Sequence, residues 1–164
     1  MHNANLIYKE WLHGDAVAAG EMIFSRIDQD TVVLWATRIF HYSLEISKVS
    51  NDLTDSLVRL SNNPLLYSNA KLQFRSFRDR FFVLSDLLTQ VECDSIRHNI
   101  EIELSVCIIG EIVTKILYNQ SLPSDPFDQD AGGWLPAALK DLIVEVHGDQ
   151  NIYEQAWNLI CFKS

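Results

Sequence analysis

The chain has 164 residues, of which 48% are hydrophobic and 21% charged, a composition that excludes a disordered protein. Six glycines and four prolines are too few for the many turns of a β-sandwich or barrel, so we expect a helical protein. The net charge of −9 disfavours binding to the phosphate backbone of nucleic acids.

Hydrophobic residues recur with helical spacing along most of the chain. In chain order, this spacing predicts helices over the ranges 5–12, 15–27, 31–49, 52–61, 68–91, 94–119, 136–147 and from 151 onward. Asp15 is expected to cap the second helix, and Asn151 with Glu154 resembles a capping box at the last one. The third helix carries apolar residues over a wide arc, so we expect it to be central. The fold class predicted is an all-α bundle of about seven helices, mostly antiparallel neighbours.

The segment 68–91 has the cleanest pattern in the chain. Its apolar residues follow a spacing of three and four over nearly three heptads: Phe74, Phe77, Phe81, Leu84, Leu88 and Val91. Such a row occurs more often in the core of one chain than between two chains. We therefore expect a monomer or a weak homodimer.

The segment 100–106 is ambiguous, because its apolar and polar residues alternate as in a β-strand. Read as a helix, the same stretch has a polar stripe formed by Asp94, His98, Glu101 and Ser105. A strand would need partners, and the only plausible ones lie inside segments with better helical periodicity. We favour the helix.

The longest loop, 119–133, is the only plausible internal boundary. About 31 residues follow it, too few for a separate core, so the prediction is one helical domain over 1–164. Nothing near the start of the sequence looks like a secretory signal, and no window is long enough to span a membrane. The three cysteines are far apart, which favours reduced thiols and a cytoplasmic protein without membrane contact.

No motif of nucleophilic catalysis or nucleotide binding occurs, so no catalytic or cofactor-binding residue is assigned. A transition-metal site is conceivable where two helices face each other. It would use His41 and Glu45 from one helix and His98 and Glu101 from the other. Solvated polar stripes are the simpler interpretation of both pairs, so we assign no metal ligand and expect no cofactor.

Two further metal patterns are incomplete. Glu10 and His13 have the spacing found in di-iron bundles, but the unit occurs once instead of twice. Asp128, Asp130 and Gly133 match positions 1, 3 and 6 of a calcium loop, but the twelfth position is Leu139 instead of glutamate.

The clearest asymmetry is one of charge. Four bases and one acid lie within 71–80, so this segment carries +3 and the rest of the chain −12. On a helical wheel one stripe contains Lys71, Arg75, Arg78 and Phe82, whereas Arg80 lies on the opposite flank. We call the first four, Lys71, Arg75, Arg78 and Phe82, the basic stripe. Arginines around an exposed aromatic ring are typical of protein interfaces. The alternative is that these bases pair with the protein's own acids.

A second candidate surface is the loop region with Phe127 and Trp134, which could form a recognition element or cover the core. Taken together, the patterns favour a non-enzymatic protein-binding module, such as an adaptor, a secretion chaperone or an immunity-type protein. The partner expected is another protein, not nucleic acid. The alternative is a helical bundle that binds a metal or a small ligand, which includes the case of an enzyme.

Overall fold

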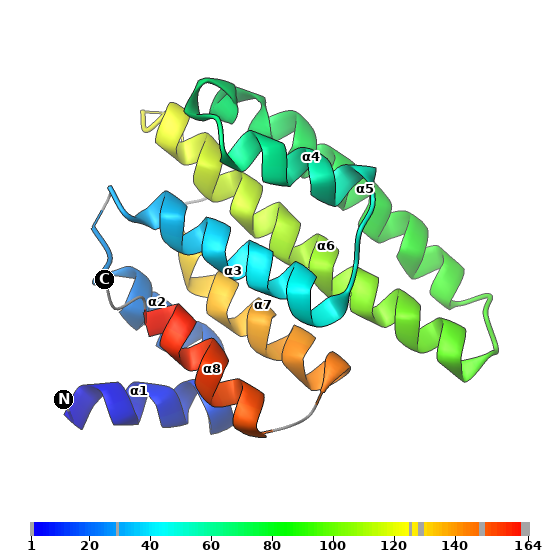
Figure 1. Ribbon diagram of the computed structural model, residues 1–164, viewed down its shortest axis with the longest axis horizontal. Coiled ribbons are helices and arrows are strands. Elements are labelled where there is room, and N and C mark those ends of the chain that lie inside the picture. The colour runs from blue at the N-terminus through cyan, green and yellow to red at the C-terminus, as the bar shows by residue number, and fades with distance from the viewer. Residues whose placement is uncertain (1, 29, 125, 128–129, 148–149, 162–164) are drawn as a thin grey trace.

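The computed structural model describes residues 2–28, 30–124, 126–127, 130–147 and 150–161. Within these residues it contains eight α-helices and one 3-10 helix and no strand, so the all-α prediction is confirmed (Figure 1). In chain order the elements are α1 (His2–His13), α2 (Ala16–Phe24), α3 (Val32–Ser47), α4 (Asp52–Ser61), η1 (Pro64–Asn69), α5 (Ala70–Leu88), α6 (Asp94–Ser121), α7 (Ala131–Val146) and α8 (Gln150–Cys161).

Capping side chains define where two of the helices begin. Asp15 accepts a hydrogen bond from the backbone N–H of Ala18, as predicted for the start of α2. Asn51 and Thr54 form a reciprocal capping box at the start of α4. The predicted cap at Asn151 falls on a side chain outside the described part of the structure.

The long helix α6 is the centre of the fold and packs against α3, α5 and α7. Helix α3 also contacts four helices, since it lies against α4, α6, α7 and α8. Residues 100–106 belong to α6, so the helical interpretation is correct. Ile100, Val106 and Cys107 are buried against neighbouring helices, which the strand-like alternation does not reveal.

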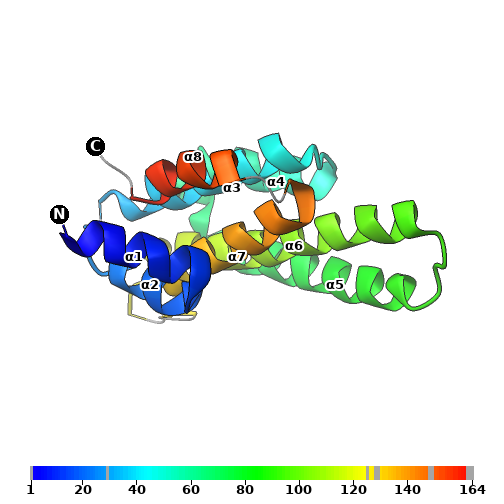
Figure 2. The same cartoon turned by 90° about the horizontal axis from the view of Figure 1, so that it is seen from below.

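The apolar row of α5 packs against α6 within the same chain. Phe74, Phe77 and Leu84 are buried, and Phe81 and Leu88 are partly buried against the core. Val91, also partly buried, lies after the end of α5, which is at Leu88 and not at residue 91 as predicted. Gly110 of α6 makes room for this contact, because a Cβ atom there would lie 2.6 Å from the ring of Phe77. The ends of α5 and α6 that are joined by residues 89–93 extend beyond the other helices (Figure 1, Figure 2).

Helix α7 begins at Ala131, five residues before the predicted start at Pro136. Its first turn is buried against α2, where Gly20 lies against the carbonyl oxygen of Gly133 and Gly132 lies against Phe24. Pro136 therefore lies inside the helix, where it has no N–H to donate to an intrahelical hydrogen bond. The expected helix start was wrong because local sequence signals do not report a contact with a distant helix.

Two tryptophans attach the terminal parts of the chain to the core. The indole N–H of Trp11 on α1 donates to the carbonyl oxygen of Pro136, and that of Trp35 on α3 donates to the carbonyl oxygen of Ile160 on α8. Both indoles are buried. None of the described helices is long and apolar enough to cross a membrane.

Candidate functional site

The basic stripe runs along the outer side of α5, from its first turn toward the projecting end. Arg75, Arg78 and Phe82 are exposed, with 53% of Phe82 accessible, whereas Lys71 is half-buried. The helical wheel therefore placed the last three residues correctly at the surface. The wheel did not show that Lys71 is partly covered by other residues.

Two bases of the stripe lie over aromatic rings. The guanidinium carbon of Arg78 is 5.6 Å from the centre of the Phe82 ring and 5.9 Å from that of Phe74. The ammonium of Lys71 is 5.4 Å from the ring centres of both Tyr118 and Phe127. These are cation–π distances, and the contacts hold the charged groups against apolar surface.

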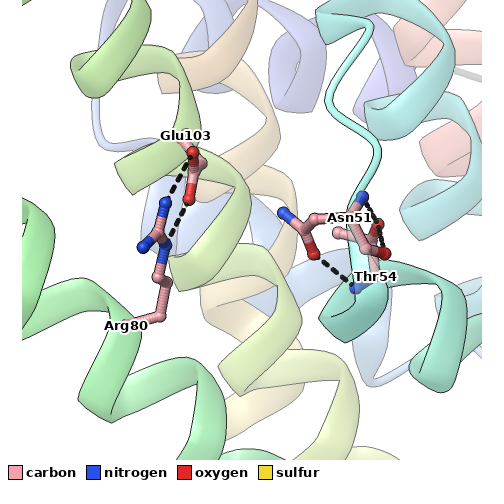
Figure 3. A network of polar contacts seen from close by, with 4 residues as sticks. All are labelled: Asn51, Thr54, Arg80 and Glu103. Carbon is pink, nitrogen blue, oxygen red and sulfur yellow. Dashed lines mark hydrogen bonds and ion pairs between the residues drawn. The ribbon is translucent and has the colours of Figure 1, made fainter.

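The alternative for these bases was that they pair with acids of the same chain. Within the described residues, no carboxylate lies within ion-pair distance of Arg75 or Arg78. Arg80, on the opposite flank of α5, does pair, since its Nε lies 2.7 Å from Glu103 of α6. Hydrogen bonding to that carboxylate raises the pKa of Arg80 above its usual value. Figure 3 shows this pair beside Asn51 and Thr54, the capping residues of α4.

Two residues of α6 extend the charged surface and were not identified from the sequence. The ammonium of Lys115 lies 5.1 Å from the centre of the Phe74 ring. Glu111, one turn earlier, is partly buried, and burial raises its pKa while the charges of Arg78 and Lys115 act in the opposite direction. The i,i+4 spacing of Glu111 and Lys115 was visible, but only the packing of α6 on α5 places them beside the stripe.

The two aromatic residues of the 119–133 region and of α7 have different environments. The ring of Phe127 lies 4.6 Å, centre to centre, from that of Phe74, and its backbone N–H donates to Asn119. It covers the core beside Lys71. Trp134 lies within α7 and is 53% exposed.

The predicted metal set is assembled only in part. His98 and Glu101 of α6 lie beside Glu145 of α7, and one ligand atom from each lies within 4.8 Å of the other two. We call these three residues the His98 cluster. His41 and Glu45, on α3, do not belong to it. Glu145 was missed because it contributes a single acid from a helix whose position relative to α6 is not encoded in local spacing.

The other metal patterns do not form the predicted geometry. Gly133, the sixth position of the calcium pattern, lies in the first turn of α7 against Glu21 instead of in a loop, and Asp128 is outside the described residues. Glu10 accepts a hydrogen bond from the backbone N–H of Asp15, which ties it to the connection between α1 and α2.

Two concave regions lie elsewhere on the surface. One, of about 430 Å³, lies between α2, α6 and the start of α7. The residues that line it include two amides and a hydroxyl but no charged side chain. The other, of about 440 Å³, lies between the α3–α4 connection and α6. Its charged residues are Lys48, Arg80 and Glu103, and the last two neutralise each other. Neither pocket contains the basic stripe or the His98 cluster.

Comparison with known proteins adds no relative to this description. No family model, no curated protein and no solved structure matches the chain.

Proposed function

We propose that this chain is a non-enzymatic protein-binding module whose basic stripe binds an acidic surface of another protein. The observation that carries the proposal is the state of Arg75 and Arg78. Both are exposed and lack an ion-pair partner among the described residues, on a chain of net charge −9. The chain contains more carboxylates than basic groups, yet none of those described pairs with these two guanidinium groups. Both guanidinium groups are therefore available to the carboxylates of a partner.

The apolar surface next to the stripe supports a protein partner. Phe82, Val83 and Leu87, in the last two turns of α5, are all exposed, between 42% and 55%. An aromatic ring with a guanidinium stacked on it resembles the centre of a protein interface, where such residues contribute most of the binding energy. A neighbouring apolar surface is what a protein partner would bury.

The charge distribution also favours one orientation of the partner. Lys71, Arg75 and Arg78 give the basic stripe three positive charges on a chain of net charge −9, so the rest of the chain carries −12. An acidic partner is therefore attracted to this side of α5 and repelled by the other surfaces, which raises the association rate and selects the docking face.

The test is quantitative affinity capture from the native host with the full chain as bait. The variant Arg75→Glu with Arg78→Glu is expected to lose the partner, since a desolvated arginine at an interface contributes about 2 kcal/mol or more, roughly thirtyfold in affinity. The matched control, Arg26→Glu with Arg59→Glu, makes the same change in net charge at exposed bases outside the stripe. It is expected to retain the partner.

Stability measurements separate loss of binding from loss of folding. Surface charge changes away from the core usually alter the free energy of unfolding by about 0.5 kcal/mol or less, so both double variants are expected to melt like the wild type. Equal capture by the stripe variant and the control contradicts the proposal. So does a stripe variant that loses stability but keeps its partner, or a bait that recovers no stoichiometric protein.

A further inference from the structure

We infer that His98, Glu101 and Glu145 form a binding site for a divalent transition-metal ion of the zinc class, which would link α6 to α7. This inference is independent of the proposed protein-binding function, because the His98 cluster shares no residue with the basic stripe. One ligand atom from each side chain lies within 4.8 Å of the other two.

The helix packing brings the three side chains together. His98 and Glu101 are one turn apart on α6, and Glu145 comes from the last turn of α7, a helix packed along α6. The imidazole Nδ1 of His98 lies 4.0 Å from a carboxylate oxygen of Glu145. Two helices thus contribute ligands to one point, and residues far apart in the chain converge there.

The distances fit a site that contracts slightly on binding. Ligand atoms about 2.1 Å from a zinc ion are roughly 3.0 to 3.5 Å from one another. The ligand atoms of the His98 cluster therefore need to approach by about 1 Å. His98 is exposed and both glutamates are partly exposed, so side-chain rotation supplies this movement without displacing the backbone.

Electrostatics favours a cation at this point. Two carboxylates face each other across the cluster, and Glu145 lies at the C-terminal end of α7, where the helix dipole is negative and disfavours a carboxylate. Within the described residues, no lysine or arginine forms an ion pair with either glutamate. A divalent cation would reduce both the repulsion between the two carboxylates and the repulsion between Glu145 and the C-terminal end of α7.

The ligand types select the class of metal. Imidazole nitrogen suits zinc, copper, iron and nickel, whereas calcium and magnesium prefer sites made of oxygen ligands alone. Three protein ligands leave at least one coordination position for water. The site is at the surface, so the ion would bridge the end of α7 to the second turn of α6.

The experiment is calorimetric titration of the chelator-treated full chain with zinc chloride. The wild type is expected to bind one equivalent. His98→Ala and the isosteric Glu145→Gln are each expected to weaken binding by about tenfold or more, because each removes a direct ligand. The matched control is His41→Ala with Glu45→Gln, which alters an exposed histidine–glutamate pair at i,i+4 on α3 and is expected to bind like the wild type.

Two further controls make the result decisive. Cys93→Ser removes the exposed thiol and is expected to leave zinc binding unchanged. Circular dichroism checks folding, and the conservative Glu145→Gln decides the matter if His98→Ala is unstable. Absence of saturable binding overturns the inference, as does equal affinity in Glu145→Gln and the wild type. Displacement of zinc by an equal concentration of magnesium overturns the assignment of the metal class.

Discussion

The indole N–H of Trp11 donates a 2.8 Å hydrogen bond to the carbonyl oxygen of Pro136, 125 residues further along the chain. The bond is buried, and it attaches α1 to α7 at the position where a proline interrupts the hydrogen bonding of α7. The Trp11 ring also packs against Tyr153 and Trp157 of α8. One side chain therefore connects both ends of the chain to the core.

Trp11→Phe is expected to lower the free energy of unfolding by about 1 to 3 kcal/mol, because phenylalanine keeps most of the ring but leaves the buried carbonyl without this donor. The matched control is Trp134→Phe on α7, an exposed ring whose replacement is expected to cost about 0.5 kcal/mol or less. Urea denaturation of the three proteins measures the difference. Equal costs at the two positions would show that the hydrogen bond contributes nothing.

Gly110→Ala is expected to destabilise the chain, the reverse of the usual effect in a helix, where alanine is favoured over glycine by about 1 kcal/mol. The added Cβ would lie 2.6 to 2.7 Å from three atoms of the buried Phe77 ring, and overpacking of this kind costs about 1 to 3 kcal/mol. Phe77→Leu shortens the side chain that Gly110→Ala meets. The cost of the double variant should therefore be less than the sum of the two single costs in urea denaturation. If the costs of the two single variants simply add in the double variant, the destabilisation by Gly110→Ala does not come from contact with the Phe77 ring.

Glu111→Gln is expected to raise stability at pH 7. Burial raises the pKa of Glu111 in the folded state, so its ionised form costs stability above the unfolded pKa, and this cost disappears as the pH falls through the raised pKa. The advantage of the glutamine variant should therefore shrink from pH 7 to about pH 4. Denaturation at several pH values measures it.

The same variant tests the binding proposal from the opposite direction. It removes an acid that interacts with Arg78 and Lys115, so capture of an acidic partner should become stronger. Weaker capture by a stable Glu111→Gln protein would place Glu111 itself in contact with a basic group of the partner.

The cysteines are expected to differ sharply in reactivity. Cys93 is exposed, and hydrogen bonding to Ser95 lowers its pKa, whereas burial raises the pKa of Cys107 to about 12. Since the thiolate is the reactive form, a thiol reagent near neutral pH should modify Cys93 quickly and Cys107 only after unfolding. Cys93→Ser should abolish the fastest phase of labelling. A fast phase that survives this substitution would contradict the assignment.

Local signals in the sequence determined the secondary structure wherever contacts with distant residues did not change the bounds of a helix. Residues 52–61 were predicted from helical spacing with their observed bounds, and the structure adds a capping box of Asn51 and Thr54 at the start. The apolar row from Phe74 to Leu88 identified the buried face of α5, since a 3.6-residue period fixes which side chains share one side of a helix. The same geometry placed Arg75 and Arg78 on one flank of α5 and Arg80, which pairs with Glu103, on the other.

Tertiary structure alone decided which helices meet. It placed Glu145, and not the expected His41, next to His98. It also placed Glu111 and Lys115 of α6 beside the basic stripe. It also moved the start of α7 to Ala131. Periodicity specifies the face that a helix buries, but it contains no information about the helix that covers that face. That choice depends on packing between residues far apart in the chain, as where Gly20 lies against Gly133, Gly110 against the Phe77 ring, and the Trp11 indole N–H donates to Pro136.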